Sequence, residues 1–265
     1  MPPRLLALVA LLVMSAPITP LWAQRTRDQA RLIFTVSGGI VYGRSLWFTS
    51  PQPVQFTSTA DTLALGRRIR STFTLGFLGS YFAGEHLGFT GEGFFLGLGY
   101  KDSCSQLYSS GSPEIAAVCQ SIQGATTSAT SVVLAAGPVF RVYSREALSP
   151  YVRASLGIVI SNQSSLRTIG RFPSSAGTVN LIVYDDSHDS RVAPTLALGA
   201  GFTTSLASGY QFRWEVRDNI VGIQQVTGPS SQIRTIPPHK LAYKHLFSMT
   251  LGFDVVLERR RGRRY

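Results

Sequence analysis

Charged residues are scarce in this chain of 265 residues: they make up 15% of it, against 44% hydrophobic residues. Water-soluble domains usually carry a larger share of charge on their surface, so the composition argues against an ordinary soluble domain. The sequence also lacks a phosphate-binding loop, a dinucleotide-binding glycine fingerprint and a cysteine-rich metal site. We therefore expect no bound cofactor.

Long apolar runs are missing beyond residue 23, where no stretch approaches the roughly 20 apolar residues of a membrane-spanning helix. Near the start, Arg4, the apolar run 5–14 and the segment Leu21–Ala23 have the order of a secretory signal peptide. We therefore predict a signal over residues 1–23, with cleavage near Ala23. The alternative, a membrane anchor, requires a longer apolar run than this one.

Alternation of apolar and polar residues at every second position is the strongest pattern that is present. It is clearest in Tyr210–Asn219, where aromatic and aliphatic residues alternate with charged and amide residues, as in a half-buried β-strand. Seven further segments alternate similarly, over residues 31–44, 73–81, 87–100, 134–142, 152–160, 192–206 and 247–257. Phe94 and Phe95 break the phase of their segment, and we expect a β-bulge there. The sequence thus predicts an all-β fold of eight antiparallel strands within residues 24–258.

The connections between these segments alternate in length. Long connections cover residues 45–69, 102–129, 163–190 and 223–244, and short ones cover residues 83–86, 144–150 and 207–209. Outer-membrane barrels show this asymmetry, with short periplasmic turns and longer external loops. We therefore predict an eight-stranded up-and-down transmembrane β-barrel with four long external loops and three short periplasmic turns.

The polar faces of the predicted strands carry charges at mid-strand, and the apolar faces carry almost none. A charge on the lipid-facing side of a barrel costs about 2 to 4 kcal/mol at mid-depth, so we expect the polar faces to line the lumen. The expected plug consists of ion pairs among Glu92, Arg141, Arg153, Arg213, Glu215, Arg217 and Asp254. The alternative is that some of them lie near strand ends in water. Tyrosines at strand ends are expected to form interfacial girdles, namely Tyr42, Tyr81, Tyr100, Tyr143, Tyr151, Tyr210 and Tyr243.

The last segment, Thr250–Leu257, has a polar-x-Gly-x-x-apolar-x-apolar pattern. It resembles the signal by which the barrel-assembly machinery recognises its substrates, and the chain after the signal is similar to small outer-membrane barrels of the OmpX and OmpA transmembrane-domain type. The resemblance implies an outer-membrane location and this machinery as a partner. That family usually ends near an aromatic residue closing the last strand, whereas here a basic tail follows over residues 259–265. We expect the tail to contact phospholipid headgroups or peptidoglycan, or to stay solvated.

Two cysteines and a strong positive charge complete the composition. Cys104 and Cys119 flank a Ser- and Gly-rich segment, and an exported chain meets an oxidising compartment, so we expect a disulfide within one loop. Two free thiols or a metal pair are the alternatives. The formal net charge is +11, but an exported barrel does not meet nucleic acid. Outer-membrane lipid and the phosphates of lipopolysaccharide are the expected partners, the latter through Arg44, Arg67, Arg68 and Arg70.

The third long connection contains the segment 185–189, Asp-Asp-Ser-His-Asp. Asp185, Asp186 and Asp189 could bind calcium through their oxygens, but their spacing matches neither an EF-hand nor a zinc signature, and we expect no metal. No nucleophile, base and orienting residue group together, so we predict a non-enzymatic outer-membrane barrel with a plugged lumen and a structural or surface-interaction role. A lipid-modifying enzyme, a small porin and a soluble secreted ligand-binding barrel are the alternatives, and the ligand of the external loops is unknown.

Overall fold

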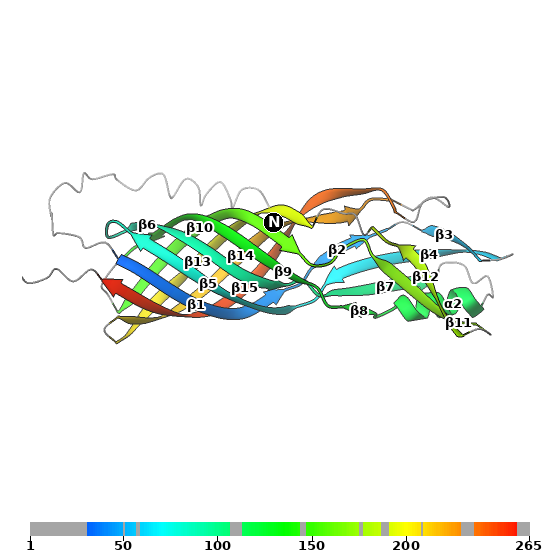
Figure 1. Ribbon diagram of the computed structural model, residues 1–265, viewed down its shortest axis with the longest axis horizontal. Helices are drawn as coiled ribbons and strands as arrows, with labels where there is room; N and C mark the ends of the chain where they lie inside the picture. The colour runs from blue at the N-terminus through cyan, green and yellow to red at the C-terminus, as the bar shows by residue number, and fades with distance from the viewer. Residues whose placement is uncertain are drawn as a thin grey trace, which may run out of the picture.

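A closed, eight-stranded antiparallel barrel forms one end of the molecule (Figure 1). The computed structural model describes residues 31–49, 51–56, 59–106, 113–143, 147–174, 177–186, 191–207, 209–228 and 236–258. The order around the ring is β1-β15-β14-β13-β10-β9-β6-β5. The strands are β1 (Arg31–Tyr42), β5 (Thr72–Phe82), β6 (Leu87–Gly97), β9 (Thr130–Arg141), β10 (Leu148–Ser161), β13 (Val192–Ala207), β14 (Tyr210–Val226) and β15 (His239–Glu258). The predicted fold class is confirmed, whereas the predicted signal (1–23) and basic tail (259–265) lie outside the described residues.

Three of the four predicted long loops contain strands or a helix, and together they build an extension beyond the barrel (Figure 1). In the fourth, residues 223–244, β14 continues to Val226 and β15 begins at His239. The extension contains β2 (Ser45–Phe48), β3 (Gln52–Phe56), β4 (Thr59–Ile69), β7 (Tyr100–Gln106), α2 (Pro113–Ile122), β8 (Thr126–Thr127), β11 (Thr168–Ser174) and β12 (Gly177–Tyr184). β2, β4, β7 and β8 form one sheet, to which β3 adds by pairing with β4, and β11 pairs with β12. In the described part of the chain, no helix is long and apolar enough to cross a bilayer.

A hydrophobic core stabilises this extension. Leu63 and Leu65 of β4, Tyr100 of β7 and Ile115 of α2 are buried in one cluster that continues into the top of the barrel. The Cys104–Cys119 disulfide joins β7 to α2, with 5.4 Å between the two Cα atoms, so the expected disulfide is present. The three connections from β1, β6 and β10 thus share one core rather than forming separate loops.

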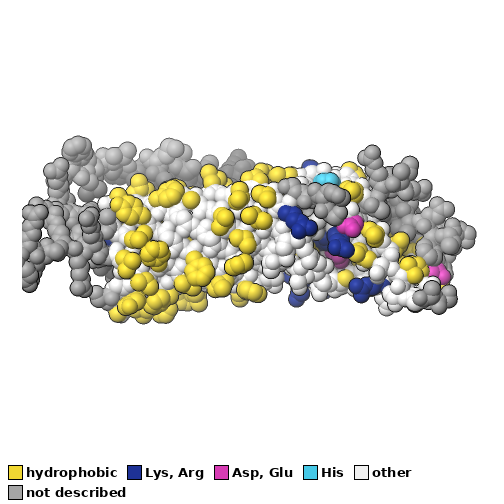
Figure 2. Space-filling model, viewed as in Figure 1, with side chains coloured by type: hydrophobic (Ala, Val, Ile, Leu, Met, Phe, Trp, Pro, Cys, Tyr) yellow, Lys and Arg dark blue, Asp and Glu magenta, His cyan; other side chains and the backbone are white. Residues whose placement is uncertain are grey.

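The barrel strands alternate as the sequence indicates, with apolar side chains outside and polar ones inside. Figure 2 shows hydrophobic side chains over the barrel and the charged ones gathered toward the extension. The predicted bulge in β6 is wrong, because β6 pairs without a register shift with both β5 and β9. Phe94 points inward and is 8% exposed, whereas Phe95 points outward and is 53% exposed. The two aromatic residues therefore continue one regular alternation.

Most of the tyrosines predicted for the girdles lie on the outer surface. Tyr42, Tyr81, Tyr143, Tyr210 and Tyr243 are exposed, but Tyr100 and Tyr151 are buried, which corrects the prediction for these two. Tyr100 begins β7 and enters the core of the extension. Tyr151 lies on the lumen side of β10, two positions before Arg153, and its hydroxyl has a charged partner there.

Candidate functional site

Four charged side chains from three strands meet in the middle of the barrel. Arg153 on β10 contacts Glu92 on β6 (Nη1–Oε2, 2.6 Å) and Glu215 on β14 (Nη2–Oε1, 2.5 Å). Arg217, also on β14, reaches the same Glu92 with both terminal nitrogens, at 2.6 and 2.8 Å. All four side chains are buried. Because each carboxylate is shared or held by two nitrogens, this cluster links opposite sides of the ring.

A second ion pair lies beside this cluster. Arg213 on β14 binds Asp254 on β15 through Nε–Oδ1 at 3.0 Å and Nη2–Oδ2 at 2.9 Å. Its guanidinium also lies over the ring of Tyr151, 4.8 Å from the centroid. The Tyr151 hydroxyl donates to Oε2 of Glu215 at 2.7 Å, so this tyrosine, which the sequence analysis placed elsewhere, joins the two groups of charges. We call these seven residues the lumen network: Glu92, Tyr151, Arg153, Arg213, Glu215, Arg217 and Asp254.

Arg141 lies apart from the lumen network, toward the end with the short turns. Its guanidinium carbon is 3.8 Å from the centroid of the Phe82 ring, and its Nε donates to the backbone oxygen of Glu85 at 2.7 Å. The structure therefore brings together six of the seven residues that the sequence analysis assigned to the plug. Those six carry three positive and three negative formal charges, so the centre of the lumen is balanced.

Glycine makes room for the network. A Cβ atom at Gly199 would lie 2.8 Å from Oε1 of Glu215 and 3.3 Å from Cγ of Arg153. The interior of an eight-stranded barrel is only wide enough for side chains to fill it. Arg153 and Glu215 fit across it here because Gly199 has no side chain. The result is a lumen filled by ion-paired groups.

Arg67 was expected to contact lipopolysaccharide, and the structure corrects this. Its side chain is 2% exposed, with Nε 2.5 Å and Nη2 2.7 Å from the carboxylate oxygens of Asp102. It also donates to the backbone oxygens of Ser165 and Arg167. Arg67 thus ties β4 and β7 to the segment before β11, and it is held inside the extension.

Aromatic rings surround this buried guanidinium. Arg67 lies 5.6 Å from the ring centroid of Trp47 and 5.3 Å from that of Tyr100, distances that favour cation–π attraction. Burial raises the pKa of the Tyr100 hydroxyl to about 12, and the nearby positive charge of Arg67 opposes part of that rise. Tyr100 therefore stays neutral at physiological pH. The other three predicted arginines, Arg44, Arg68 and Arg70, are exposed.

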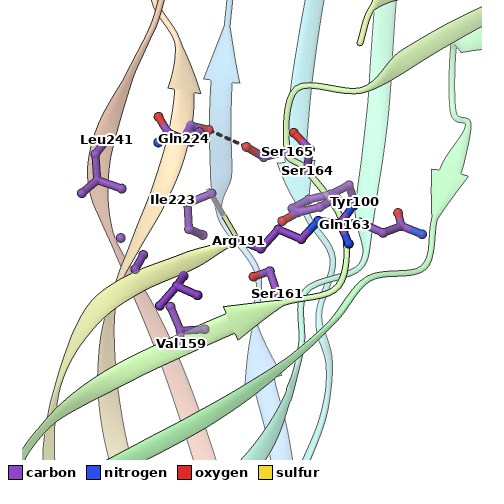
Figure 3. Close-up of a pocket in the computed structure, with 13 residues that line it drawn as sticks. Tyr100, Val159, Ser161, Gln163, Ser164, Ser165, Arg191, Ile223, Gln224 and Leu241 are labelled. Carbon is purple, nitrogen blue, oxygen red and sulfur yellow. Dashed lines mark hydrogen bonds between the residues drawn. The ribbon is translucent and has the colours of Figure 1, made fainter. Parts of the chain in front are cut away.

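A small cavity marks the junction between barrel and extension (Figure 3). Its volume is about 40 Å³, and it lies where β14 parts from β13, since their pairing begins only at Thr195 opposite Val221. Pro194, the β13 residue just before Thr195, has no N–H to donate to β14. Figure 3 shows Arg191, Gln163 and Tyr100 together at this junction, and Ser165 bound to the backbone oxygen of Gln224 at 2.7 Å. The cavity can hold water but no larger molecule.

A much larger cleft, of about 630 Å³, opens in the extension. One wall consists of the end of α2 and of β8. The other consists of the segment that follows β10, of β11, and of residues next to β12 and β13. Its lining residues are mostly polar: Ser121, Ala125, Thr126, Thr127, Asn162, Gln163, Ser164, Arg167, Ile169, Arg171, Asp185, Asp186 and Arg191. The sequence analysis missed this cleft, because its residues come from two distant connections.

The acidic segment does not assemble a metal site among the described residues. Asp185 lies 4.0 Å from Nε of Arg167, and Asp186 lies 3.9 Å from Nε2 of His239, while Asp189 is outside the described residues. Elsewhere, Asp218 and His245 form a pair with Oδ2 and Nδ1 2.7 Å apart on the outer wall. In the described residues no group of three His, Cys, Asp or Glu side chains is placed to hold a metal ion. Nor does any serine hydroxyl there hydrogen-bond to the His239 or His245 ring.

The fold is similar to those of solved outer-membrane barrels. The outer membrane protein OprG of Pseudomonas aeruginosa aligns with a TM-score of 0.54 at 9% identity, over 88% of this chain and 98% of that one. Neisserial surface protein A (TM-score 0.40, 11% identity, 88% and 100% covered) and AlkL (0.43, 13%, 89% and 93%) are also similar. No protein-family model and no curated protein sequence matches the chain.

The closed antiparallel ring and the likeness to OprG define the fold class. The chain has the fold of the small eight-stranded outer-membrane barrels, with a folded extension at the end opposite the short turns.

The Arg213–Asp254 pair provides a test of the lumen network. We expect Arg213→Met to lower the free energy of unfolding by about 3 to 5 kcal/mol, because Asp254 is left buried without its partner. The double variant Arg213→Met/Asp254→Leu should lose less than either single variant, since it leaves no charge unpaired. Urea unfolding of the barrel in lipid vesicles measures both. A loss in the double variant equal to the sum of the losses in the two single variants would show that the pair does not act as a unit.

Arg67 and its neighbour Arg68 form a matched pair in the extension. Arg67→Lys removes the two-nitrogen contact to Asp102 and should weaken the extension by about 3 kcal/mol, whereas Arg68→Lys changes an exposed residue and should do nothing. Chymotrypsin, whose cleavage sites neither change alters, should cut the extension about 100-fold faster in Arg67→Lys. The unboiled barrel should still migrate as a compact band on a gel. Equal cleavage of the two variants would contradict the role of Arg67.

Proposed function

We propose that the protein is a non-enzymatic outer-membrane anchor that closes its own lumen and presents the folded extension outside the cell. The carrying observation is the lumen network, which fills the barrel with balanced, buried ion pairs. The charged side chains of the network point inward, and aromatic and aliphatic residues cover the outer face between the short turns and the Asp218–His245 pair, as lipid contact requires. A barrel that conducts no solute carries out its role through what it exposes.

The orientation follows from the connections. Short turns mark the periplasmic side of bacterial barrels and longer connections the outer side, so the extension faces the outside and both ends of the described barrel face the periplasm. The last strand, β15, is then available to the barrel-assembly machinery. A cleavable signal near Ala23 and a periplasmic basic tail complete this proposal.

Lipid contacts accompany the anchor role. Arg44 lies over the ring of Phe247 at 5.1 Å, on the outer wall where β1 ends. The exposed Arg68 and Arg70 flank Ile69, whose N–H donates to the Arg44 backbone oxygen, and together the three arginines can bind the phosphates of lipopolysaccharide. Arg67, which is buried, takes no part in this contact.

Conductance in planar bilayers tests the closed lumen. We expect the wild-type barrel to give no discrete channel events, because the ion pairs leave no continuous aqueous path. A variant in which Glu92, Arg153, Glu215 and Arg217 are all serine should conduct, and it confirms that inserted protein is detected. Steady channel events in the wild type would contradict the proposal and favour the small porin.

A further inference from the structure

From the cleft in the extension, we infer a binding site for an oligosaccharide that carries phosphate, sulfate or carboxylate groups. The inference rests on the proposed function, because it names what the exposed extension binds. At about 630 Å³, the cleft is within the range of sites that enclose a small ligand. It lies in the extension, so a ligand can reach it from water.

The charge of the lining favours an anion. Arg167, Arg171 and Arg191 line the cleft, against two carboxylates, Asp185 and Asp186. Asp185 faces Arg167 at 4.0 Å, so these two partly neutralise each other. Among the described residues, no ion pair involves Arg171 or Arg191. Planar guanidinium groups bind phosphate, sulfate and carboxylate oxygens with two parallel hydrogen bonds, and two of them remain available here.

The rest of the lining favours a sugar. Apart from the charged residues, hydroxyl and amide side chains predominate, and only Ala125 and Ile169 are apolar. A lipid tail would find too little apolar surface in such a site. An acidic peptide would offer carboxylates to the arginines, but the lining has few apolar pockets for its other side chains. A saccharide bearing acidic groups matches both the hydrogen-bonding groups and the positive charges.

The walls of the cleft are tied together before any ligand arrives. The Arg171 backbone N–H donates to the Ser121 hydroxyl at 2.7 Å, which joins β11 to the end of α2. Asn162 and Thr130 exchange two hydrogen bonds, at 2.9 and 3.0 Å. The Cys104–Cys119 disulfide holds α2 against β7. A preformed site loses less conformational entropy on binding, so the cleft is suited to a ligand that binds mainly through polar contacts.

Binding of two labelled saccharides to the full chain in detergent micelles tests the site. One probe is a soluble sulfated tetrasaccharide, and the other is the deacylated, phosphorylated core oligosaccharide of lipopolysaccharide. We expect at least one to bind, with affinity falling as salt rises. Arg171→Gln/Arg191→Gln should weaken binding about 100-fold, since each removed guanidinium contact is worth roughly tenfold. Binding of the core alone identifies the ligand as part of the same membrane, and binding of the tetrasaccharide alone identifies a free glycan.

The control makes the same change of charge elsewhere. Lys240→Gln/Lys244→Gln also removes two positive charges, from β15 residues that do not line the cleft, and should leave affinity within twofold. Compact migration of the unboiled band and resistance to chymotrypsin show that every variant is folded. The site is overturned if neither probe binds, if desulfated and dephosphorylated probes bind equally well, if both double variants lose affinity equally, or if a polyglutamate peptide binds more tightly. None of these outcomes alters the conductance result, so the two proposals fail separately.

Discussion

Pairing of buried charge inside a narrow ring is the constraint on which the rest of this structure depends. Three arginines and three carboxylates lie within the barrel and are joined by contacts of 2.5 to 3.0 Å. An unpaired charge in such a place costs several kcal/mol, so each strand must present its charges at the correct height and on the inner face. That requirement sets the alternation, the register and the need for a glycine at position 199, where a Cβ would meet the Glu215 carboxylate.

Buried charge is also paired in the extension, but there apolar residues account for most of the buried side chains. The buried Arg67 joins its own strand, β4, to β7 through Asp102 and to the segment before β11 through two backbone oxygens. None of the connections could bury a face by itself. Sharing a core turns what the connection lengths describe as loops into a small folded unit at one end of the barrel.

Much of the barrel could be predicted from the sequence, because period-two alternation is a local property that each strand displays independently. The inward charges follow from it directly, as at Arg153 and Glu215. Phe94 and Phe95 misled the prediction, since aromatic residues were assigned to the outer face, yet Phe94 lies inside beneath the guanidinium of Arg217 at 4.3 Å.

What the sequence could not supply depends on contacts between distant segments. Arg67 and Arg68 are adjacent and chemically identical, but one is buried against Asp102 and the other is exposed. Alternation places Arg67 on the face of Leu65 and Ile69, but it does not show that this face meets Asp102, the partner that allows a charge to be buried there. The cleft is hidden in the same way, because its walls come from the second and third connections, and their packing is decided by α2, β11 and the disulfide.

We expect the aromatic face of the barrel to contact lipid and the extension not to, and the native tryptophans report on both. After residue 23 the chain has two tryptophans, Trp214 on the outer face, 42% exposed, and Trp47 in the core of the extension, 3% exposed. Fluorescence of the protein in bilayers of lipids brominated at mid-chain measures their contact with acyl chains. We expect strong quenching in the wild type and its loss in Trp214→Phe, where only Trp47 remains. No quenching in the wild type, or undiminished quenching in Trp214→Phe, would contradict this expectation.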